Sequence, residues 1–221
     1  MPAAIFLDRS FPSDVFRAIT RQVGVLETIL VADKTVSSEF SGTTMSLCIV
    51  LGYQVYAANV GNSRSVIGES DRCGKNIAIQ LTQDHLPSVE KESVRIKSKG
   101  GRIFPVYYES GLPGKQRVWL GHMDVPGLAI SRSLGDTIAT TVGVISNPDC
   151  TSYSINSSSR YLIVASDGVW EVMENQELID ILSYAENITS AMHTILAETY
   201  SRWMDSEQVV DDTTICIIRF A

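Results

Sequence analysis

Positive charge and long apolar runs are both scarce in this sequence. Its 221 residues include 18 Lys and Arg side chains against 25 Asp and Glu, which gives a formal net charge of −7. Proteins that bind nucleic acid or anionic membranes depend on clustered positive charge, so both classes of partner are disfavoured. Because no apolar stretch approaches the roughly 18 residues of a spanning helix, we expect no membrane span.

Cysteine and histidine pairs with metal-ligand spacing are also missing. The four cysteines include no C-x-x-C pair, and the three histidines show no H-E-x-x-H spacing. These absences disfavour zinc ribbons, zincins and disulfide scaffolds. The N-terminus lacks the basic region and apolar run of a signal peptide. We therefore expect a reducing compartment, either the cytoplasm or the nucleus.

The order of short elements indicates a single domain over residues 1–221, since no repeat, low-complexity tract or linker interrupts it. Apolar and β-branched runs predict strands at 3–7, 43–51, 54–60, 65–67, 77–81, 161–165 and 213–220. Helical spacing predicts a helix capped by Ser13, a continuation or second helix over 24–40, a helix over 90–99, and two more from about Asn175 and Ile188. Gly52 indicates a hairpin between the second and third strands. Strands paired by hairpins, with helices in separate blocks, favour an α+β layered sandwich.

Glycine and proline concentrate in the stretch between about 104 and 127. Such residues interrupt regular structure, so this stretch predicts an irregular and mobile excursion on the surface.

Several carboxylates stand where a predicted strand stops and the backbone turns. Asp8 ends the first strand, Asp167 follows the apolar run at 161–165, and Asp211 precedes the last strand. Carboxylates at such turns can meet at one edge of a sheet, where their oxygens suit hard divalent cations such as magnesium or manganese. The alternative is that each Asp only favours a turn or caps a helix.

Six sequence motifs between residue 41 and the C-terminal region resemble those of a known protein family. They are S-G-T-T at 41–44, A-N-V-G-N-S-R at 58–64, L-T-Q-D-H at 81–85, L-A-I-S-R-S-L-G-D at 128–136, A-S-D-G-V-W-E-V-M at 165–173 and D-D-T-T-I at 211–215. In this order they resemble the type 2C metal-dependent serine/threonine protein phosphatases. The resemblance implies an antiparallel β-sandwich flanked by helices in α-β-β-α layers, and it identifies the stretch at 104–127 with that family's flap.

The resemblance also implies a metal site. Asp8, Asp167 and Asp211 match the family's metal ligands, and two Mg²⁺ or Mn²⁺ ions are expected to activate water for hydrolysis of phosphoserine and phosphothreonine in proteins. Gly168, Glu171 and Asn62 match positions near a third, weaker metal site. A neutral amide at Asn62, where the family usually has Asp, should weaken that site.

The match is incomplete at the N-terminal end. Arg9 stands where the family has a Gly whose carbonyl ligates metal, and Ser10 replaces a His that is a candidate general acid, a loss worth roughly 10²–10⁴-fold in rate. The family's first strand, with its phosphate-binding Arg, has no counterpart before Ala3.

These departures motivate a second hypothesis, a pseudophosphatase that acts as a docking module for a signalling partner. A two-metal nuclease is a third hypothesis, disfavoured because basic phosphate-tracking clusters are missing.

The remaining motif residues favour structural roles. We expect His85 to be a hydrogen-bonded structural residue, Trp170 and Trp203 to be core or interface aromatics, and Arg132 to form an internal ion pair with Asp136 or to order the edge of the site.

Overall fold

The computed structural model describes residues 1–71, 73–107 and 111–220, and the chain forms two compact units. Unit 1 comprises Met1–Met45, Ala58–Asn62 and Asp84–Asp149. Unit 2 comprises Ser46–Ala57, Ser63–Gln83 and Cys150–Ala221. The chain passes between the units several times, so each is assembled from segments that are far apart in the sequence. A single domain over residues 1–221 stays a prediction.

A four-stranded antiparallel sheet forms the centre of unit 2. Its strands, in the order β12-β11-β4-β5, are β4 (Arg64–Ser70), β5 (Asn76–Gln80), β11 (Ser159–Ala165) and β12 (Ile215–Arg219). Ile163 on β11 lies opposite Val66 on β4 and Ile217 on β12. The prediction of strands in these four places is confirmed.

Strand β11 is apolar without interruption because both of its faces are covered. Successive side chains of a strand point to opposite faces. Leu162 packs with Val55 and Ile67 on one face, whereas Ile163 packs with helical residues such as Leu178 on the other. A strand that alternated between apolar and polar residues would leave one of these faces without a core.

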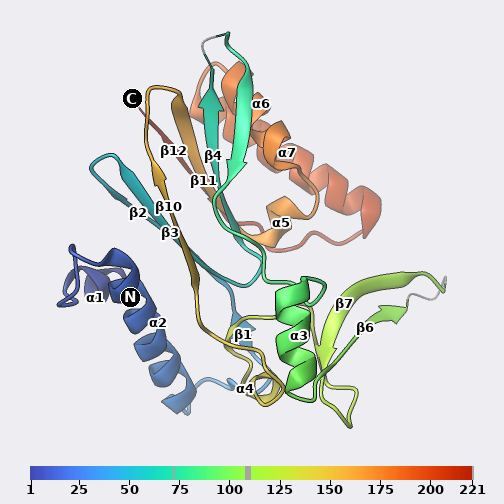
Figure 1. Cartoon of the computed structure of the whole chain (residues 1–221). Helices are drawn as coiled ribbons and strands as arrows, with labels where there is room; N and C mark the ends of the chain where they lie inside the picture. Colours follow the sequence, from blue (N-terminus) through green and yellow to red (C-terminus); the bar gives the residue numbers. More distant parts are fainter. Residues whose placement is uncertain (72, 108–110, 221) are drawn as a thin grey trace. The chain divides into compact units, whose positions relative to one another are not determined.

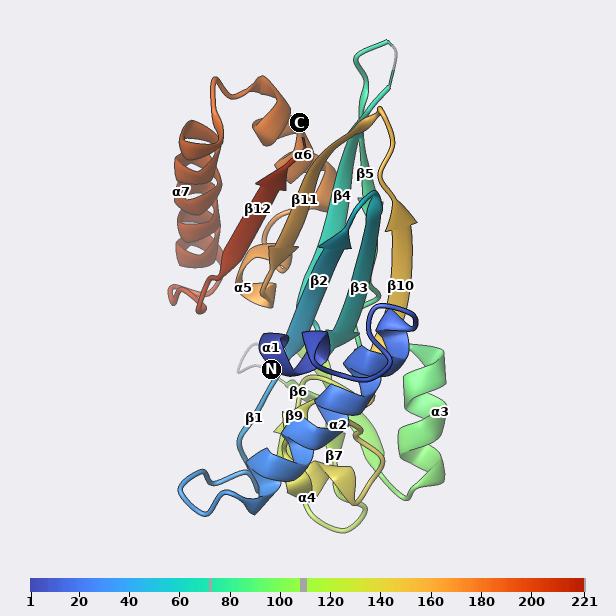
Figure 2. The ribbon, with the colours of Figure 1, turned by 90° about the vertical axis from the view of Figure 1, so that its left-hand side faces the viewer.

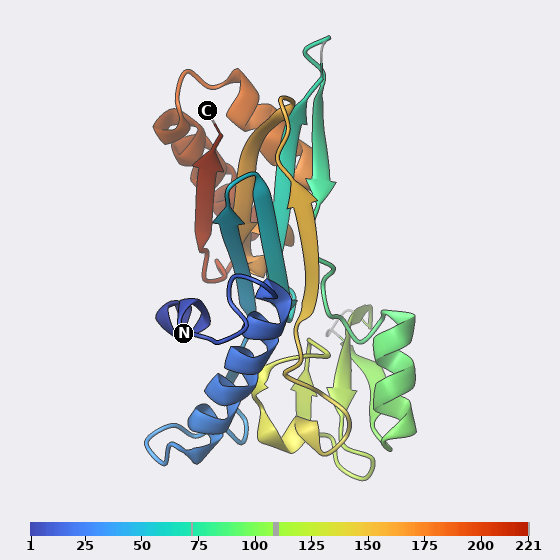
Figure 3. The same ribbon diagram turned by 60° about the vertical axis from the view of Figure 1, so that its left-hand side comes forward.

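A three-stranded sheet, β10-β3-β2, supplies the second layer (Figures 2 and 3). It contains β2 (Met45–Leu51), β3 (Gln54–Val60) and β10 (Asp149–Ser154). Gly52 has φ +58° in the tight connection between β2 and β3, which confirms the predicted hairpin. Val55 and Ala57 of β3 face the core shared with the four-stranded sheet, so the two sheets form a sandwich.

Helices cover the other face of the four-stranded sheet (Figure 1). They are α5 (Asp167–Trp170), α6 (Asn175–Tyr184) and α7 (Ile188–Ser206). Helix α7 begins after Asn187, whose Oδ1 accepts a hydrogen bond from Ser190 N at 2.9 Å. The buried residues Ile179 of α6 and Ile195 of α7 pack toward the sheet. The predicted helix starts at Asn175 and Ile188 are confirmed.

The N-terminal segment of unit 1 differs from the prediction. Residues 3–7 do not form a strand, because Pro2–Phe6 is a short helix, α1, with Pro2 in its first turn and Ile5 buried. A short apolar run has no periodicity that separates strand from helix, and proline suits the first turn of a helix. The next helix, α2 (Val15–Ala32), is capped by Asp14 rather than Ser13, since Asp14 Oδ1 accepts from Arg17 N at 3.0 Å.

A third, smaller sheet lies beside helix α3 (Glu90–Ser98) in unit 1 (Figure 1). Its strands are β6 (Arg102–Tyr107), β7 (Pro113–Trp119) and β8 (Pro126–Leu128). The remaining elements of unit 1 are the paired strands β1 (Gly42–Thr43) and β9 (Leu134–Gly135) and the helix α4 (Thr137–Thr140). Ile96, Val118 and Val144 form the apolar core beneath this sheet.

The prediction of irregular structure over 104–127 is therefore wrong for most of that stretch. Cross-strand pairing holds β6 against β7, and Phe104 stacks on Trp119 with ring centroids 4.9 Å apart. The pattern hid these strands because Pro105 and Pro113 interrupt the runs. Residues 108–110 of the predicted excursion lie outside the described ranges.

The α+β fold class with an antiparallel sandwich is confirmed. One helical layer, α6 and α7, covers the sandwich within unit 2; the second predicted layer would have to come from the other unit and stays a prediction. Among the described helices, none is both long and apolar enough to cross a membrane.

Candidate metal centre

The turn that carries Asp167 is fixed by two tryptophans. Strand β11 ends at Ala165, and Asp167 is the first residue of α5. Trp170 Nε1 donates to the carbonyl of Ala165 at 2.9 Å, and Trp203 Nε1 donates to the carbonyl of Gly168 at 2.6 Å. These hydrogen bonds satisfy two carbonyl groups of a sharp strand-to-helix turn. The two buried indole rings therefore hold the backbone on both sides of Asp167 in place. Both tryptophans are buried, as predicted.

The segment with Asp211 runs directly beside this turn. Ser166 N donates to Thr214 O at 3.0 Å, and Thr214 N donates to Ser166 Oγ at 3.0 Å. A Cβ atom added to Gly168 would lie 2.4 Å from the carbonyl oxygen of Asp212, so only glycine allows this approach. Asp167 and Asp211 therefore stand on two backbone segments in contact, at the edge where β11 ends and β12 begins.

This edge fits a hard divalent cation. Asp167 is half-buried and Asp211 is exposed, so the edge offers carboxylate oxygens that solvent can reach. Magnesium and manganese prefer such oxygen ligands and retain several waters. If an ion binds at this edge, Asp167 and Asp211 are the residues that would hold it; their role as metal ligands stays a prediction.

Asp8 stands in a different environment. Its Oδ1 accepts from Ser10 N at 2.9 Å and from Arg21 Nη1 at 3.0 Å, and its Oδ2 accepts from Gln22 Nε2 at 2.9 Å. The Ser10 amide, the Gln22 amide and the Arg21 guanidinium together hold the pKa of Asp8 below its ordinary value of 3.8. Asp8 is ionised and buried, and its oxygens already have donors.

The three predicted ligands are divided between the units, with Asp8 in unit 1 and the other two in unit 2. Within the described ranges, no three His, Cys, Asp or Glu side chains gather closely enough to hold an ion. Asp8 as a third ligand of the same centre, and a site for two ions, stay predictions.

The residues predicted for a weaker metal site are also divided between the two units. Asn62 is buried in the turn that follows β3 in unit 1, and Glu171 is exposed just after α5 in unit 2. The carbonyl of Gly168 already accepts the Trp203 indole hydrogen. A third site built from these residues stays a prediction.

Comparison with known proteins identifies the family of this arrangement. A family model described as Protein phosphatase 2C matches residues 6–211, nearly the whole chain. The chain belongs to the protein phosphatase 2C family. Two similar proteins are probable protein phosphatase 2C 38 of Oryza sativa subsp. japonica, 34% identical over 90% of this chain, and probable protein phosphatase 2C 72 of Arabidopsis thaliana, 34% identical over 91%.

The fold of this phosphatase 2C chain matches a solved structure as well. A serine-threonine phosphatase 2C from Toxoplasma gondii superposes with a TM-score of 0.83 at 20% identity, covering 99% of this chain and 71% of that one. The chain spans 44% of the rice relative and 59% of the Arabidopsis relative, about half of their length. The comparisons thus establish family and fold for this chain.

A buried charge network in this phosphatase 2C chain was not predicted as a unit. Arg132 Nη2 donates to Glu92 Oε1 at 2.7 Å, and Arg132 Nη1 donates to Asp149 Oδ1 at 2.8 Å. Burial alone would raise the pKa of Glu92, but hydrogen bonds from Arg132, Arg95 and Ser131 outweigh burial and hold that pKa far below its ordinary range. Glu92 and Arg132 are almost fully buried, so each charge depends on the other.

The predicted ion pair between Arg132 and Asp136 is wrong, since Arg132 binds Glu92 and Asp149. Asp136 has φ +46° and packs against Gly42, where an added Cβ would lie 2.1 Å from Asp136 Oδ2. With this left-handed backbone, the Asp136 side chain lies against Gly42. The alternative, that these residues order the edge of the site, stays a prediction.

His85 links the same network to the turn that holds Asn62. The ring Nδ1 of His85 accepts from Gly61 N at 3.1 Å, and the backbone N–H of His85 donates to Gly61 O at 2.9 Å. The ring Nε2 lies 3.3 Å from Asp149 Oδ2. Burial and the nearby Arg132 charge lower the pKa of His85 below 6.5. The predicted structural role of His85 is confirmed.

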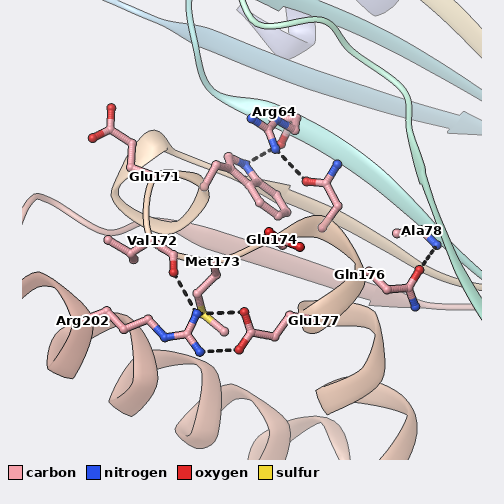
Figure 4. Close-up of a pocket in the computed structure, with 11 residues that line it drawn as sticks. Arg64, Ala78, Glu171, Val172, Met173, Glu174, Gln176, Glu177 and Arg202 are labelled. Carbon is pink, nitrogen blue, oxygen red and sulfur yellow. Dashed lines mark hydrogen bonds and ion pairs between the residues drawn. The ribbon is translucent and has the colours of Figure 1, made fainter. Parts of the chain in front are cut away.

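A pocket of about 700 Å³ in unit 2 lies next to α5 and α6 (Figure 4). Arg202 of α7 pairs with both carboxylate oxygens of Glu177 and donates to Val172 O at 2.9 Å. On another wall, Arg64 lies over the Trp170 ring and donates to Asn175 Oδ1 at 2.7 Å. Neither Asp167 nor Asp211 lines this pocket, so it is distinct from the candidate metal centre.

Proposed function

We propose that this chain forms the catalytic part of a Mg²⁺- or Mn²⁺-dependent phosphatase that hydrolyses phosphoserine and phosphothreonine in proteins. The observation that carries the proposal is the contact between the Asp167 turn and the Asp211 segment in a chain of the phosphatase 2C family. We further propose phosphoproteins of the cytoplasm or nucleus as substrates.

In this proposal, residues of the chain position the two carboxylates, and the carboxylates supply the negative charge that attracts the cation. Trp170, Trp203 and the glycine at 168 hold Asp167 beside the Asp211 segment before any ligand arrives, so little ordering is needed on binding. Divalent cations bound at this edge would lower the pKa of water and neutralise the phosphoryl oxygens. In the reaction, water adds across the phosphorus–oxygen ester bond and yields inorganic phosphate and the free hydroxyl of Ser or Thr. No covalent protein nucleophile is needed.

The test is hydrolysis of a phosphothreonine peptide across a manganese titration, with Asp167→Asn as the control variant. We expect metal-dependent turnover that falls by about 10³-fold or more in Asp167→Asn, because several kcal/mol of charge stabilisation would be lost. Thermal unfolding in the absence of metal checks that the variant is folded.

A second candidate is a docking module without turnover. The specific observation that favours it is the engagement of Asp8 by Arg21 and Gln22. Absence of turnover, together with absence of metal binding by calorimetry, would exclude the enzyme and favour this candidate. Turnover that depends on both manganese and Asp167 would exclude the docking-only function.

A further inference from the structure

A second pocket of unit 2 lies along helix α6 and has a volume of about 600 Å³. It shares Glu174, Gln176 and Glu177 with the pocket of Figure 4, so the two pockets adjoin at the first turn of α6. Thr194 of α7 stands on its opposite wall. We call this second pocket the α6 groove. Neither Asp167 nor Asp211 lines it.

The α6 groove is lined by one stripe of the helix. Positions 174, 177, 181 and 184 recur every three or four residues, so their side chains follow one another along one side of α6. The stripe is separate from the buried Leu178 and Ile179, which pack toward the sheet. It begins with carboxylates at Glu174 and Glu177 and ends with Ile181 and Tyr184, so one end is acidic and the other apolar.

The negative charge at the acidic end is only partly compensated. Glu177 forms an ion pair with Arg202, whose Nη1 donates to Glu177 Oε2 at 2.8 Å. Asp180, which also lines the groove, accepts from Gln176 Nε2 at 3.1 Å, and that amide carries no charge. Among the residues that the structure describes, no Lys, Arg or His forms an ion pair with Glu174 or Asp180. These two carboxylates therefore attract a cationic group from outside the chain.

The position of Asp180 is not explained by the helix. Aspartate lowers helix propensity in a helix interior, and a carboxylate is favoured by the helix dipole only in the first turn. The apolar end shows a similar feature, because the Tyr184 side chain is 84% exposed. Both residues face the groove, where a bound segment would contact them.

The dimensions of the stripe suit a short extended segment. Ten residues of helix span about 15 Å at 1.5 Å per residue, and an extended chain covers that length with about five residues. A metal ion suits only the acidic end, since the apolar end offers no oxygen ligands. A protein segment with one basic and several apolar side chains matches both ends.

We propose that the α6 groove binds an extended protein segment that carries an arginine or lysine and, about three positions away, apolar side chains. The cationic group pairs with Glu174 and Asp180, and the apolar side chains cover Ile181 and Tyr184. This binding is independent of the proposed hydrolysis, because neither candidate metal ligand contributes to it.

The test is fluorescence anisotropy of a labelled, N-terminally acetylated peptide of arginine, two serines, leucine and phenylalanine, titrated with the full chain at low salt. The double variant Glu174→Gln and Asp180→Asn should raise the dissociation constant about fivefold to tenfold, because two exposed ion pairs are lost. The matched control is Asp205→Asn with Glu207→Gln, two exposed sites that line neither pocket. It should change the dissociation constant by less than about twofold, since solvent and salt screen those charges.

A second pair of variants tests the apolar end. Tyr184→Ser should raise the dissociation constant about tenfold, because an aromatic anchor is lost. Tyr200→Ser is its control, since Tyr200 is 58% exposed on α7 and lies outside the groove. Both tyrosines are exposed, so the two variants should keep the unfolding temperature of the wild type.

Peptide chemistry supplies a measurement that needs no variant. A peptide with glutamate in place of arginine should bind at least about tenfold more weakly, and high salt should weaken only the arginine peptide. Four results would overturn the proposal: no saturable binding of the arginine peptide, equal binding of the glutamate peptide, equal losses in the groove variants and their controls, or a dimer in sedimentation that Tyr184→Ser dissociates. The last result would assign the groove to a second copy of the chain.

Discussion

The two units hold their turns by different means. In unit 1 the turn at Asp8 depends on its contact with the charged Arg21. The turn at Gly61 is held by His85, which reaches the ionised network of Glu92, Arg132 and Asp149 through Asp149. In unit 2 the turn at Asp167 depends on backbone contact and on indole hydrogen bonds. Turns held by charge respond to pH and to competing cations, whereas turns held by backbone contact respond to side-chain volume.

The largest expected effect tests the charged turns. Glu92→Gln removes a buried negative charge and leaves the Arg132 guanidinium with one carboxylate partner instead of two. Loss of one member of a buried ion pair costs about 3–5 kcal/mol, and we expect the free energy of unfolding to fall by about 3 kcal/mol in urea titration. Glu90→Gln, at an exposed site in the same helix, is the control. Equal losses in the two variants would show that the network contributes little.

The next effect tests the contact between backbones in unit 2. Gly168→Ala places a methyl group 2.4 Å from the Asp212 carbonyl oxygen and forces the two segments apart. Overpacking of this kind costs about 1–3 kcal/mol, and we also expect weaker Mn²⁺ binding. Gly24→Ala is the matched control, since an added Cβ there meets nothing within 4 Å in helix α2. That variant should gain about 0.5–1 kcal/mol of stability because alanine favours a helix. If Gly168→Ala leaves the stability unchanged, the close approach of the Asp212 carbonyl does not explain why glycine occupies this position.

The smallest effect concerns the pH dependence of unit 1. The pKa of His85 is lowered in the folded chain, so the unfolded chain binds more protons as pH falls below about 6.5, the ordinary value. Stability should therefore decline from pH 7 toward pH 5.5, to an extent limited by the size of the pKa shift. In His85→Asn, which cannot titrate there, this part of the decline should vanish. Parallel pH profiles of unfolding temperature for the two proteins would contradict the expectation.

Sequence patterns predicted the elements whose periodicity is regular. Strand β11 and helices α6 and α7 bury long apolar faces, and such faces are visible in the order of residues. The run at 3–7 is too short to show a period, and prolines break the pattern of β6 and β7, so these elements were missed or misassigned. Intrinsic preference at these places is weak, and the surrounding structure decides between helix, strand and loop.

The candidate site, like the fold, could be predicted from the sequence only where it depends on regular strands. Asp167 and Asp211 flank paired strands, so their closeness follows from the strands themselves. The partners of Asp8 and Arg132 do not follow in this way. Arg21 lies 13 residues beyond Asp8, and Glu92 lies 40 residues before Arg132, and no local pattern marks either pair. Contacts between charged residues distant in the sequence depend on how helices and turns are finally placed.

The paired hydrogen bonds between His85 and Gly61 fix the chemical form of the imidazole. Because Nδ1 accepts the amide hydrogen of Gly61, the ring proton must reside on Nε2, where Asp149 can accept it. A backbone amide thus selects one tautomer of a buried side chain. The Gly61 amide should exchange slowly with deuterated solvent, and its exchange rate reports directly on whether that tautomer is kept.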